Sequence, residues 1–386
     1  MFALLNDPNL PALKTLGQAD LERITGTRSA RLLRARYQRG ARAILHVRLG
    51  DSPDAGEGAI WFYAGSKAQG LVNRLPEARL DTKSGALFEA FPYDHRLPQL
   101  AHFVAEAMDI APQLIGGKAG GLPALMRYRP GLSATFRWSR EDGRVFYVKL
   151  TPKDDVAAQA VAVSHLVTAS QGLSIGFTPV EGVIKDLGLI AYAAAKGQTL
   201  ESRLIESGWV NAKSDVAQVA RALGTLATLP VTPSRILDRA TLLSRADQAS
   251  RMIALLDTEA GEAAFALVAG LKANVVPVRL RTIHGDMKLE HAFLAGPQTT
   301  FIDTESLSLG DPDYDLAKLE ARTVMASLIG QISEAEASLA MEAVRPLVGP
   351  SYAWFLNCAR LQCAKYFAQR FDPAAIPVMR KLLQPW

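Results

Sequence analysis

The chain has 386 residues, of which 49% are hydrophobic and 21% charged, with a net charge of +5. This composition is that of an ordinary globular protein with room for two domains, and it excludes a disordered chain. No apolar run reaches the ~18 residues of a membrane span, and the N-terminal segment lacks the features of a signal peptide. Two cysteines, Cys358 and Cys363, fit neither a zinc site nor a redox pair, so we expect a cytoplasmic protein without a membrane partner.

The N-terminal third is predicted to begin with a helix over 10–35 and to continue with β-rich stretches at 36–49 and 58–65. Its early arginines form a basic face without the interleaved aromatic residues of a nucleic-acid site, so a nucleic-acid partner is not expected. A helix over 97–111 leads to the glycine-rich segment 116–121. That segment lacks the spacing of a P-loop, and we expect it to be a flexible linker.

A second β-rich block follows, with antiparallel strands predicted at 126–138 and 144–150 and a helix at 154–169. From about residue 200 the pattern is mainly helical, interrupted by a strand–turn–strand region at 281–303. The order is that of a small β-lobe followed by a larger helical lobe.

One short pattern, R-Y-x-x-G-x-x-A, occurs at 36–43 and again at 127–134, an offset of 91 residues. Each copy precedes an aromatic strand. Two copies do not make a solenoid. Chance, convergent hairpin chemistry and duplication explain the repeat about equally well.

The strongest chemical signal is I-H-G-D-M-K-L-E-H-A-F-L at 283–294, followed by T-F-I-D-T-E at 300–305. The two segments place Asp286 and Asp303 17 residues apart, at the ends of two short apolar strands that we expect to be neighbours. Phosphoryl transfer requires such a pair, because one carboxylate accepts the proton of the attacking hydroxyl and the other holds the cation.

These segments resemble the catalytic region of the aminoglycoside-phosphotransferase-like family, the small-molecule branch of the protein-kinase-like superfamily. That family reads H-G-D-x-x-x-x-N, then I-D-x-E, then G-D-P-x-x-D-L-A. The chain has the corresponding residues at 284–286, 302–305 and 310–317, in the same order and spacing. The resemblance implies an α+β bilobal fold, with a small β-rich N-lobe and a larger helical C-lobe, and ATP and Mg²⁺ as cofactors.

By this resemblance Asp286 is the catalytic base and Asp303 the metal-binding aspartate. Lys288 matches the lysine that contacts the transferred phosphate in protein kinases. His291 stands where the family has asparagine, and imidazole suits Mg²⁺ less well than an amide oxygen, so the second metal position is uncertain. Taken alone, an aspartate before an apolar strand is usually a turn residue.

The resemblance also assigns the nucleotide contacts. Lys149 matches the lysine that anchors the upstream phosphates, Gly131 and Ser133 lie at the tip of the phosphate-covering hairpin, and Ala193 and Ala195 lie in the adenine hinge. Gly131 is a single glycine, not a G-x-G-x-x-G motif.

Two assignments around Lys149 stay open. The helix after Lys149 contains no glutamate, so Asp154, Asp155 or Gln159 could be its partner. Lys67 is a rival for the phosphate-anchoring lysine, although Lys149 is preferred.

In the G-D-P-x-x-D-L-A segment, Asp311 is expected to cap a helix.

The expected organisation is an N-terminal cap or β-lobe extension at 1–120, a kinase-like N-lobe at 121–196 and a helical C-lobe at 197–386. The expected function is ATP- and Mg²⁺-dependent transfer of the γ-phosphate to a hydroxyl of a sugar, aminoglycoside or amino alcohol. His291 and the missing glutamate motivate an alternative, a catalytically impaired nucleotide-binding regulatory pseudokinase, but the presence of both Asp286 and Asp303 favours a working enzyme. A protein kinase is a further alternative, weakened by the lack of D-F-G and A-P-E segments. The sequence does not indicate the oligomeric state.

Overall fold

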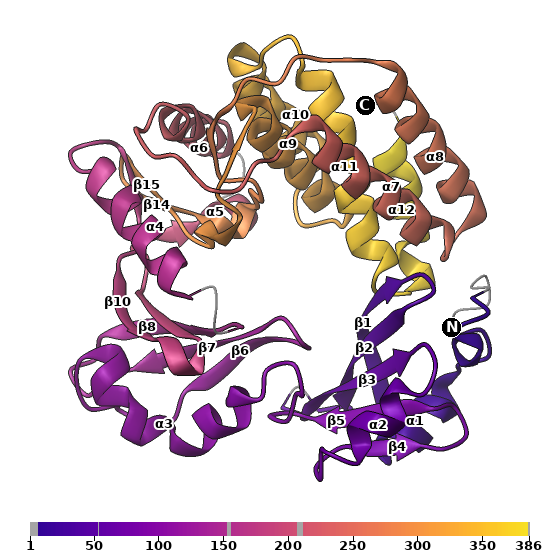
Figure 1. Ribbon diagram of the computed structural model, residues 1–386. Helices are drawn as coiled ribbons and strands as arrows, with labels where there is room; N and C mark the ends of the chain where they lie inside the picture. The colour runs from indigo at the N-terminus through magenta and orange to yellow at the C-terminus, as the bar shows by residue number, and fades with distance from the viewer. Residues whose placement is uncertain (1–6, 53, 153–155, 207–210, 385–386) are drawn as a thin grey trace. The chain divides into compact units, whose positions relative to one another are not determined.

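The computed structural model describes residues 7–52, 54–152, 156–206 and 211–384 (Figure 1). The chain forms two compact units, each built from three segments. The first comprises Met1–Ala160, Val180–Ala194 and Gln369–Asp372, and the second comprises Val161–Pro179, Ala195–Ala368 and Pro373–Trp386. No helix in the described ranges is long and apolar enough to cross a bilayer.

The first unit begins with a five-stranded antiparallel sheet of order β1-β2-β3-β5-β4. Its strands are β1 (Ala30–Gln38), β2 (Arg42–Leu49), β3 (Glu57–Tyr63), β4 (Arg79–Asp81) and β5 (Ala86–Ala90), with the helices α1 (Gln18–Thr25) and α2 (Lys67–Val72). The helix predicted over 10–35 is therefore too long. Gly26 ends α1 in the left-handed conformation, and β1 begins at Ala30.

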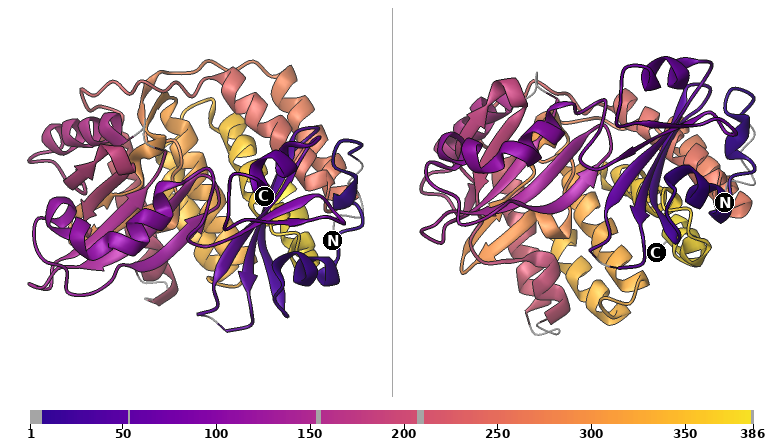
Figure 2. Two further views of the ribbon diagram at one scale, coloured as in Figure 1. Left: turned by 60° about the horizontal axis from the view of Figure 1, so that its bottom comes forward. Right: turned by 90° about the horizontal axis from the view of Figure 1, so that it is seen from below.

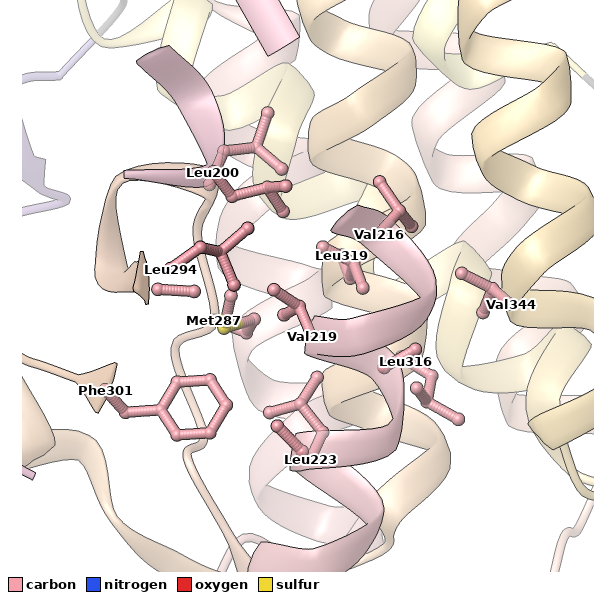
Figure 3. Close-up of a cluster of buried hydrophobic side chains, with 14 of the residues drawn as sticks. Leu200, Val216, Val219, Leu223, Met287, Leu294, Phe301, Leu316, Leu319 and Val344 are labelled. Carbon is pink, nitrogen blue, oxygen red and sulfur yellow. The ribbon is translucent and has the colours of Figure 1, made fainter. Parts of the chain in front are cut away.

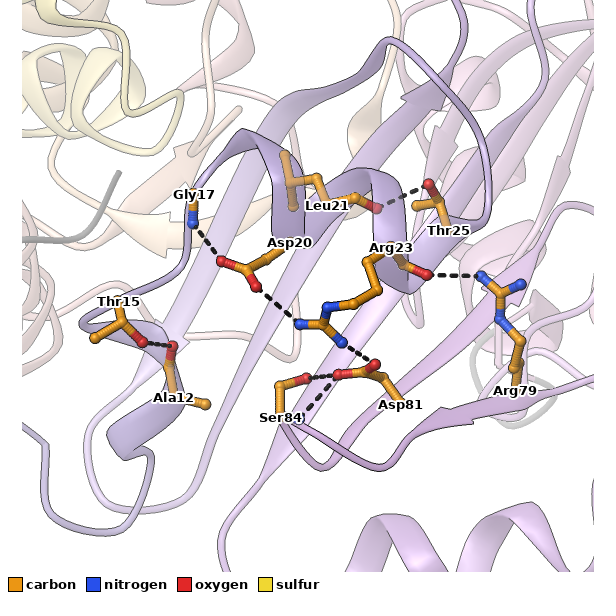
Figure 4. A network of polar contacts seen from close by, with 10 residues as sticks. All are labelled: Ala12, Thr15, Gly17, Asp20, Leu21, Arg23, Thr25, Arg79, Asp81 and Ser84. Carbon is orange, nitrogen blue, oxygen red and sulfur yellow. Dashed lines mark hydrogen bonds and ion pairs between the residues drawn. The ribbon is translucent and has the colours of Figure 1, made fainter.

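Charged side chains attach α1 to this sheet (Figure 4). Asp20 accepts the backbone N–H of Gly17 at 3.0 Å and pairs with Arg23 at 2.8 Å. Arg23 also pairs with Asp81 at the end of β4. Exposed pairs of this kind contribute little energy, so they fix the orientation of α1 more than its stability.

A second five-stranded antiparallel sheet, of order β6-β7-β8-β11-β10, follows in the same unit. Its strands are β6 (Ala124–Arg129), β7 (Ser133–Ser139), β8 (Val145–Leu150), β10 (Val180–Ile184) and β11 (Leu189–Ala193). The helix α3 (Gln99–Ile115) lies against one face of this sheet (Figure 2). The contact is an apolar cluster that includes Phe103, Phe136 and Val148.

The glycine-rich segment 116–121 is not the flexible linker that we expected. Its Gly120 N–H donates to Ser139 O at 2.9 Å, and Glu141 N–H donates to Lys118 O at 3.0 Å. The glycines let this backbone lie close to the turn between β7 and β8, where a Cβ at 120 would stand 3.2 Å from Arg140 O.

The second unit is mainly helical. Its helices are α5 (Leu200–Glu206), α6 (Ala212–Leu226), α7 (Arg239–Ala254), α8 (Thr258–Ala273), α9 (Pro312–Leu328), α10 (Glu334–Val344), α11 (Tyr352–Ala368) and α12 (Ile376–Leu383). The helix α4 (Val156–Ala169) begins in the first unit and ends in the second. A four-stranded sheet of order β12-β14-β15-β9 and a two-stranded sheet β13-β16 complete the second unit. Their strands are β9 (Ile175–Phe177), β12 (Gln198–Thr199), β13 (Arg281–Ile283), β14 (Ala292–Ala295), β15 (Gln298–Phe301) and β16 (Ser308–Gly310).

The core of the second unit holds the segment that follows β13 in place. Met287 is fully buried in a cluster with Val219 and Leu223 of α6, Leu319 of α9 and Phe301 of β15 (Figure 3). Burial of one such side chain contributes about 1.5–3 kcal/mol. The loop that carries Asp286 is therefore anchored by the side chain next to it. The mixed α+β architecture expected from the sequence is confirmed.

Candidate functional site

The loop after β13 is held through its backbone by one buried carboxylate. Asp315, in the first turn of α9, accepts the N–H of His284 at 2.6 Å and that of Gly285 at 2.9 Å. His284 is fully buried, and its Nε2 donates to Ile302 O at 2.8 Å. Because Nε2 carries the proton, Nδ1 is free to accept the N–H of Asp286, at a long 3.4 Å.

Gly285 is required by this geometry. Its φ is +76°, and a Cβ at this position would stand 2.3 Å from Ser306 O. Residues with a side chain rarely adopt this conformation, and here the side chain would also overlap backbone. The glycine thus lets the loop turn tightly between β13 and the segment before β16.

Asp286 lies between two lysines. Lys318 Nζ of α9 lies 3.1 Å from its Oδ1, and Lys288 Nζ lies 3.2 Å from its Oδ2. The side chain of Lys318 is 4% exposed, whereas that of Asp286 is 37% exposed. Burial acts to raise the pKa of Asp286, but the charges of Lys318 and Lys288 outweigh it and hold this pKa well below its usual range. Asp286 is therefore ionised and accessible to a ligand.

His291 and Asp303 meet on the other side of Lys288. His291 Nε2 is 3.4 Å from Asp303 Oδ2 and 3.3 Å from Lys288 Nζ. Burial first, and then the charge of Lys288, lower the pKa of His291 well below its usual value, so the imidazole is neutral. The lysine only donates, so its bond requires an unprotonated Nε2 and places the proton on Nδ1. That Nδ1 is buried and has no hydrogen-bond partner among the described residues.

The donor set fits Mg²⁺ at Asp303 and fits it poorly at His291. Asp303 offers a hard carboxylate oxygen and is 29% exposed. His291 offers an imidazole nitrogen, which suits softer divalent metals. In the Nδ1–H tautomer its Nε2 can accept a hydrogen bond, for example from a metal-bound water, instead of binding the metal itself.

Asp303 adopts a left-handed backbone conformation, with φ 57° and ψ 44°. Such a conformation is uncommon for a residue other than glycine, although aspartate adopts it more readily than most, and residues of this kind cluster at functional sites. A 3-10 turn, Thr304–Ser306, begins immediately afterwards. Glu305 lies in this turn and not on a strand with Asp303, and its side chain is exposed.

The strands before the two aspartates belong to different sheets, β13 to one and β15 to the other. We expected them to be neighbours. The hydrogen bond from His284 to Ile302 O joins the two segments instead. The motif histidine thus has a structural role, because it fixes the segment before Asp303 against the loop before Asp286.

The aspartates at the start of α9 accept backbone N–H groups. Asp311 is the N-cap of α9 and accepts the N–H of Asp313 at 3.0 Å, as the sequence predicted for a capping residue. Arg279 Nη2 reaches both Asp311 and Asp313 at 2.9 Å. These contacts fix the start of the helix that carries Asp315 and Lys318.

The residues assigned to the nucleotide lie mostly in the first unit. Lys149 is a half-buried residue of β8, between β7 and β11. Gly131 and Ser133 belong to the β6–β7 hairpin, where Ser133 is buried and the Gly131 N–H donates to Asp94 Oδ2. The chain passes to the second unit between Ala194 and Ala195.

The helix partner of Lys149 is still open. Gln159 Nε2 donates to the Tyr192 hydroxyl at 2.7 Å. The other two candidates, Asp154 and Asp155, lie outside the described residues.

The structure thus brings Asp286, Lys288, His291 and Asp303 together within the second unit. The sequence analysis missed Lys318. Its signal was a lysine three residues after Asp315 on α9, where i and i+3 share a face and most positions are buried. A charged residue on such a face usually has a partner.

The fold and the loop geometry define a kinase-like protein, and solved structures of that class are similar to it. A thermostable mutant of aminoglycoside phosphotransferase APH(4)-Ia has a TM-score of 0.54 at 13% identity, over 72% of this chain and 96% of that chain. Its ternary complex with AMP-PNP and hygromycin B gives 0.53 at 14% identity, over 72% and 96%. Choline kinase LicA from Streptococcus pneumoniae gives 0.50 at 14% identity, over 73% and 98%.

The phosphotransferase enzyme family (APH) matches residues 125–347, more than half of the chain. The chain therefore belongs to this family and is a phosphotransferase. The resemblance drawn from the sequence and the protein-kinase-like fold expected from it are both confirmed. No curated protein sequence matches the chain.

Proposed function

We propose that this phosphotransferase uses ATP and Mg²⁺ to phosphorylate a hydroxyl group of a small molecule. The observation that carries the proposal is Asp286, an ionised and accessible carboxylate held between Lys318 and Lys288, with Asp303 close by. Phosphoryl transfer depends mainly on positioning and on fixed charges, and this loop supplies both.

Each residue has a defined task. Asp286 orients the acceptor hydroxyl and accepts its proton as the bond to phosphorus forms. The low pKa of Asp286 makes it a weak base. A weak base suits a loose transition state, in which the acceptor hydroxyl loses its proton only after most of the bond to the leaving group has broken. Lys288, 13% exposed, can turn from Asp286 to the transferred phosphoryl group. Lys318 is almost completely buried and stays as the fixed counter-charge.

Asp303 would hold Mg²⁺, and His291 would accept a hydrogen bond from a metal-bound water. The bound metal supplies positive charge that neutralises the phosphate oxygens. Lys149 would anchor the upstream phosphates, the hairpin with Gly131 and Ser133 would cover them, and the backbone at Ala193 and Ala195 would bind adenine. The presence of AMP-PNP in the aminoglycoside phosphotransferase complex supports the use of a nucleotide.

We assign a cap or β-lobe extension to 1–120, the kinase-like N-lobe to 121–196 and the helical C-lobe to 197–386. A sugar, an aminoglycoside or an amino alcohol is the proposed class of acceptor. Hygromycin B in the same aminoglycoside phosphotransferase complex supports this choice. The buried free thiols of Cys358 and Cys363 suit a reducing compartment such as the cytoplasm.

The test is the thermal unfolding midpoint with ATP, with and without Mg²⁺, followed by ADP release with a panel of hydroxyl compounds. A ligand that binds the folded state alone raises the midpoint. We expect ATP to raise it more with Mg²⁺ than without, and we expect Asp303→Asn to remove the part that depends on Mg²⁺. The control is Glu342→Gln, which removes an exposed acid of α10.

Different results distinguish the alternatives. A midpoint shift without ADP release for any acceptor, unchanged in Asp286→Asn, would indicate a nucleotide-binding pseudokinase. Phosphate incorporation into proteins but not into small molecules would indicate a protein kinase. A midpoint that no nucleotide moves would contradict the proposal.

A further inference from the structure

The two sheets of the first unit have the same topology. The order β1-β2-β3-β5-β4 in one corresponds to β6-β7-β8-β11-β10 in the other, and all pairs are antiparallel. A helix precedes the first strand of each, and another follows the third strand. The preceding helices, α1 and α3, both end at a left-handed glycine, with φ +67° at Gly26 and +66° at Gly116.

The two sheets also share one unusual hydrogen-bond arrangement at the first hairpin. In the first, Asp7 Oδ2 accepts the Tyr37 hydroxyl and the Gly40 N–H, both at 2.7 Å. Asp7 Oδ1 accepts the N–H of the residue two positions later at 3.0 Å.

In the second hairpin, Asp94 Oδ2 accepts the Tyr128 hydroxyl at 2.9 Å and the Gly131 N–H at 2.5 Å. Asp94 Oδ1 also accepts the N–H of the residue two positions later, at 2.9 Å. The same four groups thus form the same three bonds in both places.

The sequence carries the same correspondence. The pattern R-Y-x-x-G-x-x-A occurs at 36–43 and 127–134, and D-x-x-L-P-x-L occurs at 7–13 and 94–100. Convergent hairpin chemistry would not explain a matching segment that lies about 30 residues before the hairpin, nor a matching strand order. We infer that residues 7–90 are a second copy of the small lobe at 94–193, and that this copy positions the nucleotide-covering hairpin instead of binding a nucleotide.

The register of the strands shows what changed in the first copy. Ala43 pairs with Phe62, and the equivalent Ala134 pairs with Leu150. The next pairs are therefore also equivalent, and Trp61 of β3 stands at the position of Lys149 in β8.

The first copy lacks the lysine that would anchor phosphates, and its equivalent face is closed. Trp61 is fully buried in an apolar cluster with Tyr63 of β3 and Ala68 of α2. Lys67, the rival anchor in the sequence, does not occupy the equivalent position. It is the first residue of α2, and its ammonium lies 4.8 Å from the centre of the Tyr63 ring.

Instead, the first copy contacts the hairpin of the second. A Cβ on Gly131 would stand 2.6 Å from Trp61 Cη2, so the indole lies directly against the hairpin tip. The Arg36 guanidinium donates to Pro130 O in the same tip. The rings of His46 and Tyr128 meet edge to face, 5.5 Å apart. Trp61 is therefore a positioning residue, and its effect on the nucleotide rests on the proposed function.

The first test is a double-mutant cycle read by thermal unfolding, which does not depend on activity. Gly131→Ala adds a Cβ against Trp61, whereas the control Gly40→Ala adds one at φ +69° with its nearest neighbour at 3.4 Å. We expect Gly131→Ala to lower the midpoint at least twice as much as Gly40→Ala. Trp61→Leu should lower the midpoint less in the Gly131→Ala background than in the wild type, because the clash is relieved. The contact would be overturned if Gly40→Ala and Gly131→Ala lowered the midpoint equally. It would also be overturned if the effects of Gly131→Ala and Trp61→Leu on the midpoint were additive.

The second test separates positioning from mere stability. Phe62→Leu removes a buried aromatic ring from the opposite face of the same strand, where it cannot reach the hairpin. We expect Trp61→Leu to raise the KM for ATP severalfold with little change in kcat, and Phe62→Leu to leave that KM unchanged. Equal KM values in both variants would overturn the positioning role. If even the wild-type protein binds no nucleotide, the proposed function fails, while the stability cycle still decides the contact.

Discussion

The negative charge of Asp286 is stabilised in part by Lys318, a lysine that is almost completely buried. Lys318 is buried on α9, and the attraction of Asp286 outweighs the effect of burial, so the pKa of Lys318 is raised and the lysine stays protonated. The pair is therefore ionised on both sides at neutral pH. Substituting one partner of such a pair leaves the other charge poorly compensated.

We expect Lys318→Met to raise the pKa of Asp286, because a major charge that lowers it is lost. A carboxylate with a raised pKa is protonated at higher pH, so the acid limb of the kcat/KM profile should move to higher pH. The rate at neutral pH should fall about tenfold or more, as for other preorganised charges. The pH–rate profile measures both effects, and Lys272→Met, which removes a 53% exposed lysine of α8, is the control. An unmoved acid limb would show that Lys318 does not control Asp286.

We propose that His291 controls how well the site accepts Mg²⁺. The structure places a neutral imidazole beside Asp303 where the family has an amide. Amide oxygen is a harder ligand than imidazole nitrogen, so His291→Asn should lower the Mg²⁺ concentration for half-maximal activity, by about tenfold. The same change should reduce any preference for Mn²⁺ over Mg²⁺. Titrations of both metals test this, and an unchanged ratio would mean that His291 does not contact the metal or its water.

At the scale of elements, the loop that carries Asp286 depends on a few backbone contacts between β13, the turn before β16 and α9. Asp315 accepts two backbone N–H groups and is completely buried in this junction. Burial raises the pKa of Asp315, and the backbone N–H donors oppose that rise. An unpaired N–H in this position would cost about 1–3 kcal/mol, so the carboxylate stabilises the turn even without touching substrate.

Gly285→Ala should be one of the most damaging small substitutions in the second unit. The left-handed conformation costs about 1 kcal/mol or more for alanine, and the 2.3 Å approach to Ser306 O adds strain. We expect the free energy of unfolding to fall by about 2–4 kcal/mol. Gly330→Ala is a matched control, with φ +75° and nothing within 4 Å of the added Cβ, and should cost about 1 kcal/mol. Urea denaturation of the two variants measures the difference, and similar losses would contradict the close approach.

The elements that the sequence predicted well are those with strong local patterns. The β7–β8 hairpin and α3 were found, because turn residues and apolar periodicity are local signals. The strand predicted over 126–138 is instead two strands, β6 and β7, separated by a turn at Gly131. The helix over 10–35 was drawn too long, because the apolar positions after Ala30 fit a strand as well as a helix. The main features that the sequence did not show are long-range contacts, among them the Asp94 bonds to the hairpin and the Lys318 pair with Asp286.

At the scale of the whole molecule, neither unit is a continuous piece of chain. The chain passes between them after residues 160, 179, 194, 368 and 372. Contacts between residues far apart in sequence close long loops, and such contacts form late and slowly in folding. The motif at 284–317, by contrast, is nearly local, and for this reason the sequence alone identified most of the residues that the structure brings together around Asp286.

Within the first unit, hydrogen bonds join β1 to a segment more than 330 residues later in the chain. The Ala35 N–H donates to Gln369 O at 2.6 Å, and Arg34 Nε donates to Gln369 Oε1 at 2.9 Å. Gln369→Ala keeps the backbone bond and removes the side-chain acceptor of a charged donor. We therefore expect a loss of about 1–3 kcal/mol in the free energy of unfolding.

Hydrogen exchange can show where that loss falls. Amides of β1 should exchange faster in Gln369→Ala, while amides of β14 and β15 should not change, because local opening follows local contacts. Gln362→Ala is the control, since its side chain donates to Arg245 O at 3.1 Å within the second unit. Faster exchange of β1 in both variants, or in neither, would show that Gln369 does not hold this strand. Faster exchange in Gln369→Ala alone would establish that the first sheet is completed by a residue near the end of the chain.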